Sequence, residues 1–189
     1  APKTRDYKLD RMPDHPLLIR PSANADLPAL TRIYGHAVLH GTGTFELEAP
    51  DEPEMSRRRD AVLANGLPWL VAEREGNVLG YAYANHFRPR RAYRFCVEDS
   101  IYLDERARGH GVGRLLLAEL MAQCAARGAR QMLAVIGDSA NAGSVGVHHA
   151  CGFEDSGVLK AAGWKFGRWL DVVLMQKALG EGANTEPRD

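Results

Sequence analysis

The sequence predicts a single α/β domain in which a mixed, mostly antiparallel sheet is flanked by helices. Its 189 residues are the length of one domain, and a content of 45% hydrophobic and 25% charged residues excludes a disordered or fibrous chain. A strand–loop–helix–strand unit near the middle of the chain lies among hairpin patterns. Such a unit adds one parallel strand pair to an otherwise antiparallel sheet.

In the first half of the chain, capping and turn residues define the ends of the elements. Asn24 or Asp26 can cap the first helix, and Gly66 ends the second. Gly76-Asn77 separates two strand-like runs and is typical of a hairpin turn. The expected elements are a strand at 17–20, helices at 24–40 and 51–65, and strands at 69–75 and 78–87.

The second half contains the clearest helix. Leu116, Leu120 and Cys124 recur every four residues, and Gly128 follows the last turn. Gly152 stops a second helix in the same way. The expected elements are a strand at 92–103, a helix at 111–127, a strand at 131–136, a helix at 141–151, and strands at 153–159 and 169–177.

The two ends of the chain contain few residues that could be buried. Residues 1–16 are rich in charged residues and proline, so we expect a flexible arm there. Residues 180–189 have the composition of a disordered tail. No repeat or linker interrupts the remainder, which predicts one domain over residues 17–179.

Charge, cysteine content and hydropathy limit the classes of partner. The 24 Lys and Arg residues balance 24 Asp and Glu residues, so the basic excess of a nucleic-acid-binding protein is missing. Cys96, Cys124 and Cys151 are isolated, which argues against a disulfide framework or structural zinc. No run approaches the roughly 18 apolar residues of a membrane span, and the charged N-terminal residues do not form a secretory signal. We expect a cytoplasmic protein that binds no membrane, nucleic acid or metal.

The loop that precedes the clearest helix has the composition of an anion-binding site. Gly109, Gly111 and Gly113 permit a tight turn and a close approach of a ligand to the backbone. The first N–H groups of the helix have no partner within it and lie at its positive end. Arg108 and Arg114 add positive charge. The loop therefore predicts a site for a phosphate or pyrophosphate.

Two common nucleotide-binding motifs do not fit this loop. A P-loop requires Gly-Lys-Ser/Thr at the start of the helix, and here Arg114 follows Gly113. The dinucleotide fingerprint G-x-G-x-x-G would place its third glycine at Arg114 or Leu116, counted from Gly109 or Gly111. The pattern that remains is Arg-x-x-Gly-x-Gly.

The Arg-x-x-Gly-x-Gly pattern at 108–113 resembles the pyrophosphate loop of the GCN5-related N-acetyltransferases, which bind acetyl-CoA. A second segment, from Asn141 to Gly152-Phe153, resembles the family's motif of an Asn that opens a helix closed by Gly-Phe. The two segments occur in the family's order with one expected strand between them. The resemblance implies the family's mixed α/β fold and acetyl-CoA as co-substrate, without a metal.

Further segments resemble the phosphinothricin acetyltransferase branch of the family, which includes acetyltransferases of methionine sulfone and methionine sulfoximine. These segments are 88–89, 93–94, 97–103 and, most specifically, 161–171 with the sequence AAGWKFGRWLD. The resemblance covers about residues 17–179. Because members of this branch are typically homodimers, it also implies a homodimer in which residues 164–166 reach the partner subunit.

The resemblance implies two catalytic residues. Glu98 matches the general base, or the anchor of a water that acts as one, because an attacking amine must lose a proton; otherwise Glu98 forms a salt bridge, with Arg94 as the candidate partner. His148 matches the group that protonates the leaving CoA thiolate; otherwise it is a packed or surface histidine. The neighbouring His149 points about 100° away on a helix, so the two histidines cannot face one site.

The resemblance also assigns the acetyl-CoA site. Strand backbone groups before the loop would bind the pantetheine amides like an added strand, and His110 would contribute its backbone. Asn141 would bond the pantetheine arm or act as a helix N-cap. The expected acetyl-CoA-binding residues are Ile101, Tyr102, Leu103, Arg108, Gly109, His110, Gly111, Val112, Gly113, Arg114 and Asn141.

Arginines on the hairpin before the expected base suggest an acceptor with a carboxylate, which Arg binds through two hydrogen bonds. Arg88 matches the branch best, and Tyr93 and Arg94 are close in sequence, whereas Arg90 and Arg91 fit a solvated turn. Aromatic side chains could wall the acceptor site or belong to the core. The candidates for this wall are Phe45, Tyr83, Trp164 and Phe166.

Three functions are compatible with these residues. The first is an acetyl-CoA-dependent N-acetyltransferase in which the α-amino group of phosphinothricin, methionine sulfone, methionine sulfoximine or a similar small molecule attacks the thioester directly. The second is an acetyltransferase of another amine: a protein N-terminus, a lysine or a polyamine. The third is an acyl-CoA sensor without turnover, which Glu98 together with His148 disfavours. Cys96 has no histidine beside it in the sequence, so an acyl-enzyme is not expected.

Overall fold

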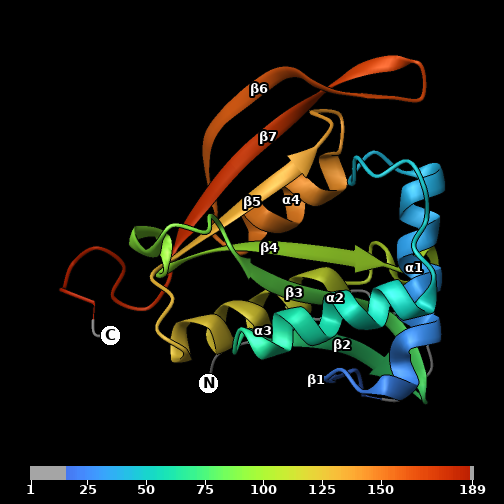
Figure 1. The fold of residues 1–189 in the computed structure, drawn as a ribbon, viewed down its shortest axis with the longest axis horizontal. Coiled ribbons are helices and arrows are strands. Elements are labelled where there is room, and N and C mark those ends of the chain that lie inside the picture. The colour runs from blue at the N-terminus through green and yellow to red at the C-terminus, as the bar shows by residue number, and fades with distance from the viewer. Residues whose placement is uncertain (1–15, 188–189) are drawn as a thin grey trace, which may run out of the picture.

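A single seven-stranded sheet forms the frame of the molecule, in the order β1-β2-β3-β4-β5-β7-β6 (Figure 1). The structure is a computed structural model that describes residues 16–187. Its strands are β1 (Leu18–Pro21), β2 (Trp69–Arg74), β3 (Asn77–His86), β4 (Cys96–Leu103), β5 (Gln131–Gly137), β6 (Glu154–Lys165) and β7 (Arg168–Ala178). Its α-helices are α1 (Leu27–His40), α2 (Glu52–Ala64), α3 (Val112–Ala126) and α4 (Ala142–Ala150), with short 3-10 helices at Asn24–Asp26, Arg91–Tyr93 and Glu105–Ala107.

The β4–β5 pair is the parallel pair that the strand–loop–helix–strand unit predicted, and the pairs on either side of it are antiparallel. Its register runs from Cys96 opposite Gln131 to Asp99 opposite Ala134. Beyond that point β4 and β5 diverge, as Figure 1 shows. The divergence leaves one backbone edge of each strand without a neighbouring strand, and this gap is where the candidate site lies.

Helices α1 and α2 cover one face of the sheet, and α3 covers the other (Figure 1). The alternation of side chains along β4 follows from this arrangement. Tyr102 packs edge-on against Tyr34 of α1, with ring centroids 4.8 Å apart. Its neighbours Ile101 and Leu103 face Gly113 at the start of α3. Consecutive residues of β4 therefore pack against helices on opposite faces of the sheet.

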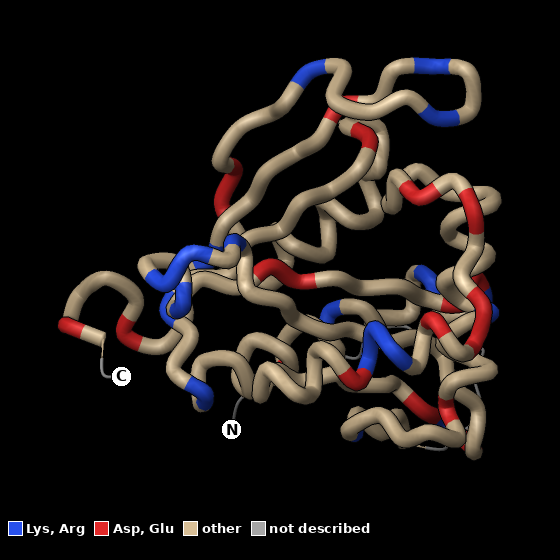
Figure 2. The backbone as a smooth tube through the Cα atoms, viewed as in Figure 1, with Lys and Arg blue, Asp and Glu red and all other residues tan. Residues whose placement is uncertain are grey.

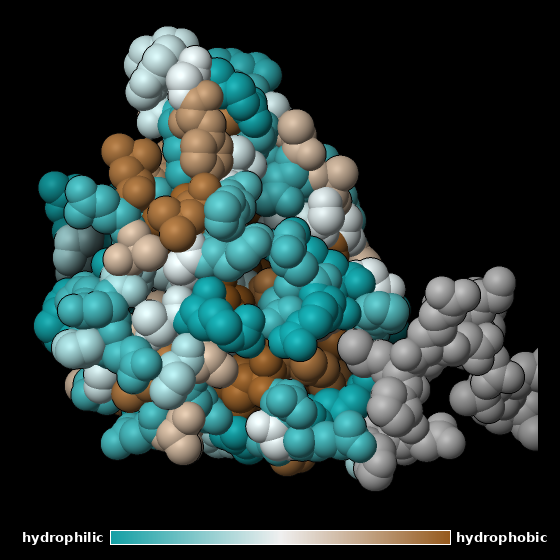
Figure 3. Space-filling model, turned by 90° about the vertical axis from the view of Figure 1, so that its right-hand side faces the viewer, coloured by the Kyte–Doolittle hydropathy of each residue, from teal (hydrophilic) through white to brown (hydrophobic). Residues whose placement is uncertain are grey.

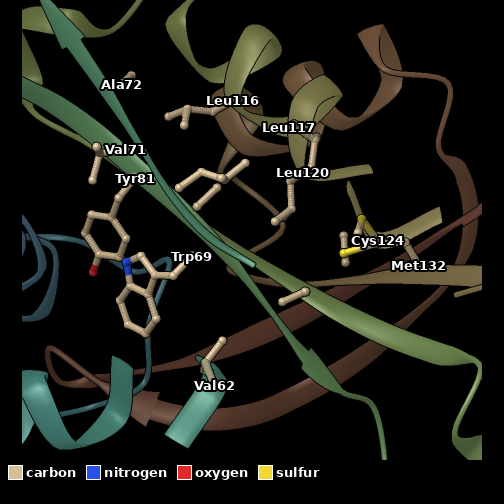
Figure 4. Packing of buried hydrophobic residues seen from close by; sticks show 14 of the residues in the cluster. Val62, Trp69, Val71, Ala72, Tyr81, Leu116, Leu117, Leu120, Cys124 and Met132 are labelled. Atoms are coloured by element: carbon tan, nitrogen blue, oxygen red, sulfur yellow. The ribbon is translucent and has the colours of Figure 1, made fainter. Parts of the chain in front are cut away.

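The core fills both layers. Leu116, Leu117 and Leu120 of α3 are fully buried on one side of the strands, and Trp69 and Tyr81 lie on the other side (Figure 4). Burial of one such leucine stabilises the fold by about 1.5–3 kcal/mol. The indole of Trp69 also stacks on Tyr83, with ring centroids 4.1 Å apart. These contacts fix β4, and with it the site, between two packed layers.

Among the element boundaries that differ from the sequence-based expectation, three have a clear reason in the structure. The β2–β3 turn consists of Glu75 and Gly76, both with positive φ (52° and 74°), so Asn77 already belongs to β3. β4 begins at Cys96 because residues 91–93 form a 3-10 helix instead of strand. β6 continues to Lys165, six residues beyond the expected end, because it pairs with β7 over this length. The extra residues lie on an exposed edge strand, so their sequence does not alternate between apolar and polar residues.

The expected flexible arm over residues 1–16 lies, except for its last residue, outside the described part of the chain. Residues 180–187, expected as part of a tail, form turns, and Arg130 donates a hydrogen bond to the Gly182 carbonyl. Basic and acidic residues are interspersed along much of the backbone (Figure 2). Within residues 16–187 no helix is long and apolar enough to cross a membrane.

Candidate active site

A cavity of about 850 Å³ opens where β4 and β5 diverge. Its walls come from residues 98–103 of β4, the loop and first turn at 107–114, the end of β5, the start of α4 and the segment 41–44 after α1. Segments that are distant in sequence therefore meet at one gap in the sheet. Among the described residues, no group of three or more His, Cys, Asp or Glu side chains is placed to hold a metal.

The glycine loop forms one end of the cavity. Gly111 caps α3 in the left-handed conformation with φ 76°, and Gly109 has φ 78°, so both positions favour glycine for conformational reasons. A Cβ atom on either would meet nothing within 4 Å, which shows that the space in front of the backbone is open. A Cβ on Gly113 would lie 3.3 Å from Leu103 Cδ1, so this glycine lets α3 approach β4 closely. The loop thus presents the free N–H groups of a helix start to an open space, as an anion site requires.

Nearly all of the residues expected to bind acetyl-CoA line this cavity. The exception is His110, which does not line it. Because pairing with β5 ends at Asp99, the β5-facing backbone edge of residues 101–103 has no strand partner. Such an edge can bond the amides of an extended ligand as a further strand would. The residues that line the cavity as expected are Ile101, Tyr102, Leu103, Arg108, Gly109, Gly111, Val112, Gly113, Arg114 and Asn141.

The Asn141 side chain is the N-cap of α4. Its Oδ1 accepts a hydrogen bond from the Ser144 amide at 3.2 Å, and its Nδ2 donates to the Gly137 carbonyl at 3.4 Å. The amide oxygen is therefore committed to the cap. What Asn141 can offer to a ligand in the cavity is the remaining N–H of its amide nitrogen.

Glu98 is half-buried in the cavity wall, on the sheet face that α1 and α2 cover. Burial is the main cause that raises its carboxyl pKa above the ordinary value, the charge of Asp99 raises the pKa further, and Arg88 opposes the shift. A carboxylate with a raised pKa is a better proton acceptor near neutral pH. The Arg94 guanidinium lies over the Phe95 ring, 4.3 Å from its centroid, and donates to the Arg91 carbonyl. The positive charge that opposes the shift in the pKa of Glu98 is that of Arg88.

His148 lies in the cavity wall but is only 2% exposed. Its Nδ1 is 2.7 Å from the Ser144 carbonyl oxygen, which can only accept, so Nδ1 carries a proton. Its Nε2 is 3.0 Å from Asp99 Oδ2. Burial alone would lower the pKa of His148, but the hydrogen bond and charge of Asp99, with the Ser144 carbonyl, outweigh it and raise the pKa above 6.5. The His148–Asp99 pair therefore holds one proton between Nε2 and Oδ2.

Sequence reasoning missed Asp99. This residue is 6% exposed and its side chain points to the face opposite Glu98, while its Oδ1 is buried without a hydrogen-bond partner among the described residues. The sequence did contain a signal for a buried Asp99, because this residue shares the inward side of an apolar strand with Val97 and Ile101. A carboxylate at such a position requires a buried partner.

The side chains expected around the acceptor do not line the cavity. On the segment 88–94, Arg88 lies over the Phe87 ring and Tyr93 is 41% exposed, packed edge-on against the same ring. The 3-10 helix at Arg91–Tyr93 lies in the connection between β3 and β4, and Figure 2 shows the basic residues of this connection gathered at one end of the molecule. The charge of Arg88 lowers the pKa of Glu98, which ties this residue electrostatically to the cavity wall.

The four expected aromatic residues have different surroundings. Tyr83 belongs to the stack with Trp69, and burial raises its pKa. The Phe45 ring lies against the backbones of Gly137 and Gly163. Trp164 and Phe166 are 57% and 55% exposed near the end of the β6–β7 hairpin. None of the four lines the cavity.

Comparisons with known proteins show the family of the chain. A model of the acetyltransferase (GNAT) family matches residues 35–153. Phosphinothricin N-acetyltransferase of Alcaligenes faecalis is 54% identical over 89% of this chain and 86% of its own length. The L-methionine sulfoximine/L-methionine sulfone acetyltransferase of Salmonella typhimurium is 38% identical over 88% of this chain and 97% of its own.

Solved structures share the fold. A phosphinothricin acetyltransferase of Sinorhizobium meliloti in complex with acetyl-CoA superposes with a TM-score of 0.89 at 50% identity, covering 92% of this chain and 94% of that chain. A ribosomal-protein-alanine N-acetyltransferase from Brucella melitensis gives a TM-score of 0.83 at 43% identity, covering 86% of this chain and 99% of that one. The fold class expected from the sequence is confirmed. The chain belongs to the GNAT acetyltransferase family, as its glycine loop and its Asn-to-Gly-Phe helix predicted.

Proposed function

We propose that this protein is an acetyl-CoA-dependent N-acetyltransferase that acetylates the α-amino group of a small amino-acid-like substrate. Phosphinothricin, methionine sulfone and methionine sulfoximine are the first candidates, because they occur in the names of its relatives. The observation that carries the proposal is the single cavity that has an open glycine-lined helix start at one end and the half-buried Glu98 in its wall.

The residues present fit acetyl-CoA. The backbone N–H groups at 109–113 would hold the pyrophosphate, and the unpaired β4 edge at 101–103 would bond the pantetheine. The remaining N–H of Asn141 would bond the same arm. When bound, acetyl-CoA supplies a thioester whose carbonyl carbon an amine can attack.

Glu98 removes a proton from the attacking amine, directly or through one water. An amino acid carries an ammonium group at neutral pH, and only the neutral amine is a nucleophile. Glu98 must be ionised for this step, so activity should fall at low pH. Burial and the charge of Glu98 raise the pKa of Cys96, two residues earlier on β4, which disfavours this thiol as the nucleophile of an acyl-enzyme.

His148 supplies the proton that the CoA thiolate needs as it leaves. The proton is the one that His148 Nε2 shares with Asp99, since Nδ1 is bonded to the Ser144 carbonyl. Glu98 and Asp99 are consecutive residues of a strand and point to opposite faces of the sheet. Proton removal and proton donation are therefore separated by the strand itself.

Arg88 is the group that would recognise the carboxylate of the acceptor, since its charge already acts on Glu98. The test is release of free thiol from acetyl-CoA with methionine sulfone, methionine sulfoximine or phosphinothricin, each beside its amide. We expect turnover of the free acids and much slower turnover of the amides, and Arg88→Ala should reduce the difference. Exposed Arg90 provides the matched control, Arg90→Ala. Equal rates for free acid and amide would refute carboxylate recognition.

A second acceptor class has specific support, because one similar structure is named a ribosomal-protein-alanine N-acetyltransferase. A peptide that begins with Ala presents its amine without an α-carboxylate. We expect such a peptide to react far more slowly than methionine sulfone. Faster turnover of the peptide would favour a protein acceptor instead.

The homodimer and the cytoplasmic location stay predictions. Three large apolar side chains of the β6–β7 hairpin, Trp164, Phe166 and Trp169, are each more than half exposed. The upper part of the face in Figure 3, where this hairpin ends, also shows hydrophobic surface. A second copy of the chain would cover such a patch. Light scattering after size exclusion should give twice the 20.8 kDa of the chain, and Trp164→Ser should shift it toward the monomer.

A further inference from the structure

A buried lysine lies outside the residues that the proposed reaction uses. Lys165 is the last residue of β6 and is 3% exposed, although the rest of that strand is largely exposed. Lysine is almost never fully buried unless its ammonium group is paired. Lys165 Nζ donates to the carbonyl oxygens of Gly41 at 2.9 Å and Thr44 at 2.8 Å. Burial lowers the pKa of this ammonium group, which is the cost of placing it there.

A second contact joins the same two segments. The ring of Phe45 lies against Gly163 of β6, and a Cβ on that glycine would overlap the ring. The ring also touches Gly137 at the end of β5, where a Cβ would collide with the Thr42 carbonyl oxygen. Two glycines thus form a notch for one aromatic ring. The segment 41–45 is fastened to the hairpin by this ring and by the ammonium group of Lys165.

The segment that is held in this way is a wall of the active-site cavity. Residues 41–44 line the cavity, and a Cβ added at Gly43 would lie 3.5 Å from the side-chain nitrogen of Asn141. The hydroxyl of Thr44 is 3.0 Å from that of Tyr34, which packs on Tyr102 of β4. In Figure 1 the connection between α1 and α2 extends toward the end of β5 and the β6–β7 hairpin. The segment therefore spans the gap from the Glu98 face of the sheet to the start of α4.

We propose that Lys165 is a positioning residue for the acceptor substrate: with Phe45, it holds the segment 41–44 where this segment closes the acceptor side of the cavity. Lys165 is not a cavity-lining residue, so it acts through the two carbonyl groups that it binds. This proposal rests on the proposed function for its kinetic part. It explains why an ammonium group, with several donors, is buried at this position.

The test is Lys165→Met, which keeps the length of the side chain and removes its donors. We expect the KM for methionine sulfone to rise at least tenfold, while kcat changes less than threefold and the acetyl-CoA Kd from calorimetry stays within twofold. The matched control is Lys160→Met, because Lys160 is on the same strand, is exposed and pairs only at the surface with Asp171. The control should keep the KM of the unmodified protein.

Hydrogen exchange of the free protein gives a readout that does not need turnover. The amides of residues 41–46 should exchange at least tenfold faster in Lys165→Met, whereas those of α3 should be unchanged. Phe45→Leu, which empties part of the glycine notch, should act in the same direction and serves if Lys165→Met folds poorly.

A KM within twofold of the unmodified protein, or unchanged exchange at 41–46, would overturn the proposal. So would a parallel loss of acetyl-CoA affinity, because the effect would then not be confined to the acceptor side. If the unmodified protein acetylates no amino acid, the proposed function fails, and the exchange experiment still decides whether Lys165 holds the segment.

Discussion

The substitution Gly111→Asp tests the glycine loop most directly. Gly111 has φ 76°, so any other residue there costs about 1–2 kcal/mol of stability. No atom lies within 4 Å of the new Cβ, so there is no steric clash to add to that cost. The carboxylate would instead project into the open space that we propose for the pyrophosphate. The fold should survive with a modest loss, while the ligand meets a negative charge.

The size of the binding effect follows from Coulomb's law. Two unit charges about 4 Å apart repel by about 4 kcal/mol at an effective dielectric constant of about 20, which corresponds to a factor of about 10³. Gly111→Asn is the matched control, because Asn has the same size, adopts positive φ more readily than most residues and carries no charge. We expect the acetyl-CoA Kd of the Asp variant to exceed that of the Asn variant by about 10²–10³-fold in calorimetry at low salt. A ratio below three in two folded variants would refute the placement of the pyrophosphate at this loop.

Three further predictions concern the base, the buried pair and the core. Glu98→Gln should lower kcat/KM by about 10²-fold or more with an unchanged acetyl-CoA Kd. The acidic limb of the unmodified enzyme's pH profile should lie above pH 4.5, because burial raises the pKa of Glu98. Near-full activity of the Gln variant from pH 6 to 9 would mean that Glu98 has a structural role only. The raised pKa of His148 stabilises the fold fully below pH 6.5 and less as the pH rises through the folded pKa, so His148→Gln should lose more unfolding free energy at pH 6 than at pH 9. The difference should be about 1.4 kcal/mol for each unit by which the pKa in the folded state exceeds that in the unfolded chain. Equal losses in urea titrations at the two pH values would contradict the His148–Asp99 pair. Leu120→Ala, at a fully buried position, should lower the unfolding free energy by about 2–5 kcal/mol in the same urea assay. Leu115→Ala, at a position 48% exposed on the same helix, should lower it by under about 0.5 kcal/mol. Similar losses would mean that α3 does not bury the face that carries Leu120.

The parts of the site that the sequence predicted are those encoded within a few residues. The glycine loop is an example, because positive φ at Gly109 and Gly111 and the start of α3 are local properties. The strands and helices around it follow in the same way from spacing and from terminating glycines. Asn141 was correctly offered as an N-cap for the same reason, since the cap joins residues three apart.

The parts that the sequence did not predict depend on distant partners. His148 and Asp99 are 49 residues apart and meet only because α4, which packs on α3 and β5, carries His148 to the inward side of β4. Lys165 and the carbonyl of Gly41 are separated by 124 residues. None of the side chains expected around the acceptor lines the cavity, and a short 3-10 helix at residues 91–93 replaces the strand that was expected there. Neither a contact between residues far apart in the sequence nor a short 3-10 helix produces a periodic pattern of apolar residues.

The three tryptophans of the chain occupy two very different environments, and this makes its fluorescence informative. Trp69 is 2% exposed within the aromatic stack, whereas Trp164 and Trp169 are 57% and 62% exposed on the hairpin. An ionic quencher such as iodide should therefore reach the hairpin pair and leave the emission of Trp69 nearly untouched. If a second copy covers the hairpin, dilution should increase the quenchable fraction, while the blue-shifted emission of Trp69 persists until the domain unfolds. One spectrum thus separates assembly from unfolding without an added label.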